Sequence, residues 1–146
     1  MKKKLLTLIA FAVVTITSAF AGSNDISKNA LTTFSESFAK ASNVKWEKNE
    51  TYDKVSFQLN GQSLSALLSE EGKLIAVSRN ILSTELPIGL QTALDKSFSS
   101  YWISDLAEYS VNNETIYYMT IENADEKTTL ESIGTYDWSV MKKTVK

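Results

Sequence analysis

The stretch NVKWEKNETYDKVSFQLNGQSLSALLSEEGKLIAVSRNI, residues 43–81, decides the fold of this chain. Short runs of alternating apolar and polar residues are separated by tight polar turns. Val55, Phe57 and Leu59 share one side of such a run, because successive side chains in a strand point to opposite faces. Asn60-Gly61 then suits the positive φ angles of a two-residue hairpin turn. We predict an antiparallel meander. Its four strands cover residues 44–48, 55–59, 64–68 and 73–81.

Two amphipathic helices are predicted to flank this meander. Ser27 is a suitable N-cap for the first helix. Pro87, the only proline, begins the second, because its φ angle is already set for a helix. This helix runs to Ser99 or Ser100. Apolar residues recur on one side of each helix and are predicted to face the core: Leu31, Phe34 and Phe38, and Leu90, Leu94 and Phe98.

A degraded second copy of the meander appears in residues 104–145, with strands at 107–111, 117–121, 128–133 and 138–145. We interpret the chain as two α-β-β-β-β repeats, about 27–81 and about 87–145. The repeats align at two offsets. An offset of 63 residues matches Trp46 with Tyr109, Leu67 with Leu130, Ile75 with Trp138 and Val77 with Val140; an offset of 62 matches Val55, Phe57 and Leu59 with Tyr117, Met119 and Ile121.

The predicted fold class is α+β, with tandem α-β4 repeats forming one eight-stranded antiparallel sheet. Both helices would cover one face of this sheet and leave the other face open. The domain is expected to occupy residues 22–146, because residues 1–21 have the features of a secretory signal peptide. Three lysines at positions 2–4 precede the apolar run Leu5–Ile16, and Ala19-Phe20-Ala21 is a cleavage signal. Cleavage between Ala21 and Gly22 predicts a periplasmic or secreted protein without a membrane span.

Composition excludes several functions. Loss of the signal peptide removes three lysines and no acid, so the formal net charge changes from −2 to −5. Such an acidic chain is poorly suited to nucleic acid, and the basic tail of Lys142, Lys143 and Lys146 is interpreted as a solvated strand end. The sequence contains no cysteine, so an exported form has no disulfide and depends on burial for its stability.

The sequence offers little for catalysis. It contains no histidine and no cysteine, which removes the common serine–histidine and cysteine–histidine nucleophiles and the usual zinc ligands. We predict a protein that is not an enzyme and has neither a cofactor nor a metal site. A carboxylate pair remains compatible with the composition. Residues 123–126 have too few ligands for a calcium loop and are interpreted as a solvated turn.

The arrangement of these segments resembles the PepSY-like, β-lactamase-inhibitor-like proteins exported by Gram-negative bacteria. The matching features are the first helix, residues 44–47 (VKWE), the Asn60-Gly61 hairpin, residues 72–75 (GKLI) and Leu86-Pro87, and the likeness covers residues 27–145. The resemblance implies a fold like that of the β-lactamase inhibitory protein, whose concave open sheet grips a partner enzyme. That inhibitor is held by disulfides, whereas this chain has no cysteine.

Aromatic and hydroxyl residues are predicted to lie on the open face. In Tyr117-Tyr118 and Asp137-Trp138, Tyr117 and Trp138 would be in the core, so that Tyr118 and Asp137 face outward. The candidate binding residues are Tyr118, Thr120, Ser78 and Trp102. Our first hypothesis is a non-catalytic cell-envelope binding protein, an inhibitor-like module that grips an exported protein or peptide. The alternative is a small-ligand or carbohydrate-binding domain, and a third interpretation is that these are surface aromatics with no partner.

Overall fold

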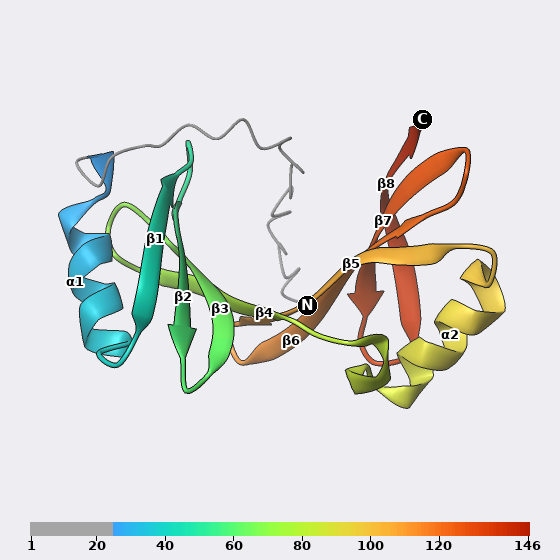
Figure 1. Ribbon diagram of the computed structural model, residues 1–146, viewed down its shortest axis with the longest axis horizontal. Helices are drawn as coiled ribbons and strands as arrows, with labels where there is room; N and C mark the ends of the chain where they lie inside the picture. The colour runs from blue at the N-terminus through green and yellow to red at the C-terminus, as the bar shows by residue number, and fades with distance from the viewer. Residues whose placement is uncertain (1–24) are drawn as a thin grey trace, which may run out of the picture.

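The computed structural model describes residues 25–146, which form one eight-stranded antiparallel sheet with two α-helices (Figure 1). The predicted α+β fold class is therefore confirmed. The predicted signal peptide and its cleavage point between Ala21 and Gly22 lie outside the described residues. The elements in chain order are α1 (Lys28–Ser37), β1 (Ser42–Lys48), β2 (Asp53–Leu59), β3 (Gln62–Leu68), β4 (Leu74–Asn80), the short 3-10 helix η2 (Ser83–Glu85), α2 (Ile88–Phe98), β5 (Trp102–Val111), β6 (Glu114–Glu122), β7 (Glu126–Ile133) and β8 (Asp137–Val145).

The strands follow one another across the sheet in chain order, from β1 to β8. The pairing of β4 with β5 joins the two α-β-β-β-β segments, although η2 and α2 separate these strands in the sequence. Figure 1 shows α1 outside the first strands and α2 outside the last ones, with β4 and β6 crossing between them. The sheet therefore curves between two wings, and each wing has a helix on its outer side.

Both helices cover the same face of the sheet, as predicted. Opposed residues on neighbouring antiparallel strands share a face. One such row runs from Phe57 through Leu64, Arg79 and Glu108 to Tyr117. Phe57 packs against Phe34 of α1, whereas Tyr117 belongs to the core beneath α2. The opposite face carries neither helix, and we call it the open face.

Aromatic rings fill the core beneath α1. The Phe34 ring centroid lies 5.1 Å from that of Phe57 and 5.3 Å from that of Trp46, with edge-to-face geometry in both pairs. Ala30 and Phe34 are buried, but Leu31 is 36% exposed, so the prediction of Leu31 as a core residue was wrong. The buried stripe of the helix is centred one residue earlier, on Ala30.

Aliphatic residues fill the core beneath α2. Leu90, Met119, Ile121 and Leu130 are almost fully buried there. Trp138 packs against them, and its indole nitrogen donates a 3.0 Å hydrogen bond to the Leu90 carbonyl. This bond ties β8 to α2 and satisfies the polar atom of a side chain that is otherwise apolar.

Polar contacts fix the start of α1 on the β3–β4 turn. Ser27 is the N-cap, as predicted, and its hydroxyl accepts a hydrogen bond from the Ala30 amide at 3.3 Å. The same hydroxyl donates to the Glu70 carbonyl at 2.5 Å, and the Thr33 hydroxyl donates to the Gly72 carbonyl at 2.7 Å. The turn and the helix therefore hold one another in place.

The fifth strand differs from the prediction at its start. It begins at Trp102, whereas the alternation predicted a strand from residue 107. An irregularity in the β5–β6 register between Ile103 and Asp105 explains the difference, because it interrupts the two-residue period on which the prediction relied. The first residues of β5 therefore show no regular alternation of apolar and polar side chains in the sequence.

We predict that Gly72→Ala destabilises the fold much more than Gly61→Ala. Both glycines have positive φ angles, +85° and +79°. A Cβ at Gly72 would lie 2.8 Å from the Asn29 carbonyl oxygen, whereas a Cβ at Gly61 meets no atom within 4 Å. Both variants should lose about 1 kcal/mol from backbone strain, and the clash should add about 1–3 kcal/mol at Gly72. Urea unfolding measures the difference, and equal losses in the two variants would contradict the close approach of α1.

Candidate binding face of the sheet

Small hydroxyl side chains cover the first half of the open face. Ser56, Ser65 and Ser78 oppose one another on β2, β3 and β4, and the row continues to Tyr109 on β5. The Ser56 and Ser65 hydroxyls lie 3.2 Å apart, which is hydrogen-bonding distance. All four residues are partly exposed. The row forms a low polar strip that ends at the Tyr109 ring.

Tyr109 and Tyr118 form an aromatic pair at the centre of the sheet. Their ring centroids are 5.2 Å apart and the planes meet at 84°, an edge-to-face arrangement. Tyr118 opposes Ala107 on β5, whose small side chain leaves room beside the two rings. Ser78 hydrogen-bonds to Tyr109, and the Tyr118 hydroxyl donates to the Glu131 carboxylate. Tyr118 and Ser78, both predicted as binding residues, are thus connected through Tyr109.

The environment of this pair keeps both phenols neutral well above physiological pH. Burial is the main cause that raises the pKa of Tyr109 to about 12, and the negative charge of Asp105 adds to it. Burial likewise raises the pKa of Tyr118 to about 12, with a further contribution from Glu131. Asp105 is thus close enough to Tyr109, and Glu131 to Tyr118, to act electrostatically on that ring.

The other two predicted residues lie on the same face at different depths. Thr120 opposes Asp105 and Thr129, next to Tyr118 along the face, and is only 7% exposed. Trp102 opposes Glu122, farther along β6, and is 53% exposed. The Lys146 ammonium lies 4.9 Å from the Trp102 ring centroid. The structure therefore gathers Ser78, Tyr118 and Thr120, and places Trp102 at the end of the face.

Sequence reasoning did not select Tyr109, Asp105 or Glu131. The repeat offset of 63 matched Tyr109 with Trp46, which packs in the core beneath α1. The register instead puts Tyr109 on the open face, opposite Ser78. Glu131 could have been found from the sequence. When β6 and β7 pair across their short turn, Glu131 lies directly opposite Tyr118.

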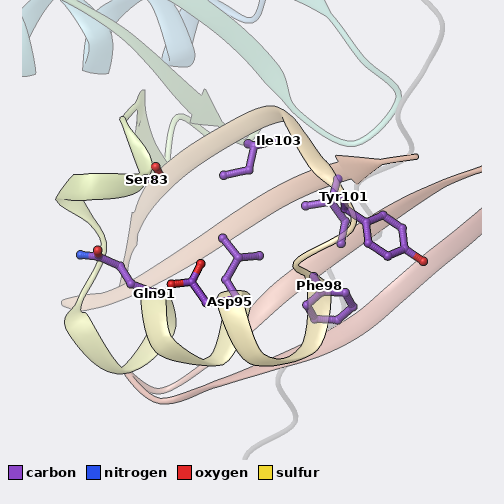
Figure 2. A pocket seen from close by; sticks show the side chains of 8 residues that line it. Ser83, Gln91, Asp95, Phe98, Tyr101 and Ile103 are labelled. Atoms are coloured by element: carbon purple, nitrogen blue, oxygen red, sulfur yellow. The ribbon is translucent and has the colours of Figure 1, made fainter. Parts of the chain in front are cut away.

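A concavity with a volume of about 330 Å³ lies on the helix-covered side, between α2 and β5. Figure 2 shows Gln91, Asp95 and Phe98 on successive turns of α2 and Ile103 on β5 among the side chains that line it. Leu94 adds to its apolar lining. Phe98 and Tyr101 supply aromatic side chains to the same lining.

Within residues 25–146, no group of three or more acidic side chains could hold a metal ion. No helix in the same range is both long and apolar enough to cross a membrane.

No sequence-family profile and no curated protein matches this chain significantly, but solved structures share its fold. A protein from Bacteroides eggerthii, described provisionally as periplasmic, superimposes with a TM-score of 0.71 at 11% identity, over 82% of this chain and 88% of that one. A DUF2874 family protein from Bacteroides ovatus gives 0.70 at 16% identity, over 82% and 87%. A BLIP-like protein (BLIP, the β-lactamase inhibitory protein) from Bacteroides fragilis gives 0.65 at 18%, over 82% and 86%. The expected BLIP-like fold is confirmed; the narrower PepSY resemblance stays a prediction.

We predict that two of the six tyrosines ionise near pH 12. Phenolate absorbance measured against pH should lose this step in the Tyr109→Phe, Tyr118→Phe double variant. Because both pKa values are raised in the folded state, their contribution to stability is complete below about pH 10 and falls as the pH rises to about 12. If the folded protein, checked by circular dichroism, titrated all of its tyrosines near pH 10, the described environment of the pair would be wrong.

Proposed function

We propose that this chain is a non-catalytic binding protein of the cell envelope, which takes a segment of an exported protein or peptide on the open face of its sheet. The observation that carries the proposal is the Tyr109–Tyr118 pair, set among hydroxyl side chains on the face that neither helix covers. Tyrosine supplies a large contact area with few rotatable bonds and is enriched at the centres of protein interfaces.

The curvature of the sheet favours a protein segment as the occupant. The two wings of Figure 1 rise on either side of the crossing strands β4 and β6, so a segment seated there could be contacted from both halves. A fold shared with a BLIP-like protein agrees with a role in gripping a partner, and we extend that role to this chain as part of the proposal. Inhibition of an exported enzyme is one form that this binding could take.

The export of the chain is part of the proposal and rests on the signal-peptide features of residues 1–21. The provisional description of the Bacteroides eggerthii protein as periplasmic supports it. The non-catalytic role rests on the residue types of the whole sequence, which has neither histidine nor cysteine.

We predict that Tyr118→Ala weakens binding of an envelope partner at least tenfold, whereas Tyr136→Ala leaves it unchanged. Loss of the Tyr118 ring removes half of the aromatic pair at the centre of the face, and such central aromatic residues often contribute about 2 kcal/mol or more. Tyr136 is 73% exposed and lies beyond the end of β7, so it is a matched control. Capture from an envelope extract identifies the partner, and titration with each purified variant gives the Kd.

The proposal fails if no partner is captured under any condition, or if Tyr118→Ala and Tyr136→Ala behave alike while both variants remain folded. Circular dichroism and the melting temperature provide the folding check. A loss of affinity that is specific to Tyr118→Ala, in a variant with native circular dichroism, would support the open face as the binding surface.

The concavity beside α2 favours the alternative function, binding of a small ligand or carbohydrate. Its volume is at the lower end of the range for small-molecule sites, and it combines apolar side chains with the polar ends of Gln91 and Asp95. This location differs from the one suggested by the sequence, which assigned both functions to the open-face aromatics.

If the alternative is correct, a sugar or small amphipathic compound should raise the melting temperature, because a ligand that binds only the folded state stabilises it. Leu94→Phe, which fills the concavity, should abolish that shift, and Tyr118→Ala should preserve it. A thermal-shift screen of sugars, peptides and metal ions measures all three proteins. A shift that Tyr118→Ala abolishes and Leu94→Phe preserves would instead place the ligand on the open face.

A further inference from the structure

Two carboxylates flank the tyrosine pair on the open face. Glu131 of β7 lies directly opposite Tyr118 of β6. Asp105 of β5 precedes Ala107, the residue opposite Tyr118, by two positions, so its side chain leaves the same face of the sheet. Asp105 is exposed and Glu131 is partly exposed. The strand register and the contact between the two rings therefore place the four groups together on this face, and the effects of Asp105 on the pKa of Tyr109 and of Glu131 on that of Tyr118 agree with this placement.

Asp105 and Glu131 differ from most other acidic residues on the strands, which form ion pairs with lysine or arginine. Within residues 25–146, the ion pairs engage other carboxylates, including Glu47, Glu108 and Glu122, and none joins Asp105 or Glu131 to a lysine or arginine. The Lys54 ammonium lies on the open face 3.8 Å from Glu47, at the far side of the serine strip. Lys142 of β8 also lies on the open face, opposite Thr129, but no ion pair joins it to Asp105 or Glu131 within residues 25–146. The strands β5 to β7 beside the tyrosine pair therefore combine negative charge with aromatic rings.

We propose that the partner places a basic side chain, lysine or arginine, against the Tyr109–Tyr118 pair between Asp105 and Glu131. This inference rests on the proposed function and specifies the chemistry of its occupant. A cation is attracted by the negative face of a tyrosine ring, and the attraction grows when the site is shielded from water. The two carboxylates add a complementary charge on either side, and the Tyr118 hydroxyl stays bound to Glu131 because the phenol remains neutral.

The same features select against other partners. A phosphate or carboxylate group at this position would face Asp105 and Glu131 and be repelled, and an apolar side chain would leave both charges desolvated without a partner. A neutral carbohydrate could stack on the rings but would make no use of the two charges. The basic side chain is the occupant that satisfies rings and carboxylates together.

The test is selection from a random peptide library displayed on phage, against the folded chain, followed by Kd measurement with the selected synthetic peptides. We expect the peptides to share a lysine or arginine whose replacement by norleucine weakens binding about tenfold. The Asp105→Asn, Glu131→Gln double variant should weaken binding by a similar factor. Affinity for the unaltered chain should also fall as salt is raised from 50 to 500 mM, because the attraction is screened.

A double variant with two acids removed outside the strands, Glu36→Gln in α1 and Glu50→Gln between β1 and β2, is the matched control and should bind as well as the unaltered chain. Peptides that depend on Tyr118 but carry no shared basic residue, and that bind Asp105→Asn, Glu131→Gln normally, would overturn this inference and leave the proposed function standing. Peptides indifferent to Tyr118→Ala, or no selected peptide at all, would overturn both.

Discussion

The pairing of β4 with β5 is the constraint on which the rest of the structure depends. Four opposed residue pairs hold the two halves together, and α1 and α2 each cover a separate core on either side of this seam (Figure 1). On the helix-covered side, the Arg79 guanidinium lies 3.1 Å from the Glu108 carboxylate and 3.2 Å from the Glu85 carboxylate. Arg79 belongs to neither hydrophobic core. Arg79 and Glu108 are directly opposed, so this contact is a charged cross-strand pair at the junction. A partly exposed ion pair adds little stability by itself, but here it fixes the register where hydrophobic burial is weakest.

That register also creates the candidate site. Ser78 belongs to the first half and Tyr109 to the second, and they meet only because β4 and β5 are neighbours. A shift of one residue at the seam would turn Tyr109 toward the helices and replace it on the open face by a neighbour. The same shift would separate Arg79 from Glu108. The helix-covered side and the open face therefore depend on the same β4–β5 register. If either half folded alone, the tyrosine pair would lack its serine strip.

The helices and the hairpin-connected strands were predicted because they depend on local signals, whereas the joining of the two halves into one sheet was predicted from the repeat. Asn60 and Asn112 adopt positive φ angles at hairpin turns, as their positions between alternating runs indicate. The repeat offset is where local signals failed. Offset 63 pairs Leu67 with Leu130, but β3 buries Leu67 and Leu68 in succession, and only Leu68 shares the helix-covered face with Leu130. Burial on both faces of a strand hides its two-residue period, so the offset of 63 matches Tyr109 on the open face with Trp46, which packs in the core beneath α1.

The two halves contribute different kinds of side chain to the open face. The first half presents small hydroxyls, with Ser56, Ser65 and Ser78 in one row, whereas the second presents the large rings of Tyr109 and Tyr118. A partner seated across the seam would find space above the serines and contact area at the tyrosines. The helix-covered side shows no such division, because aromatic rings pack in both cores, including Phe34 and Phe57 in the first and Tyr117 and Trp138 in the second. The second half therefore has large rings on both sides of the sheet, whereas Phe34, Trp46 and Phe57 of the first half pack beneath α1 and its serine row lies beside the seam.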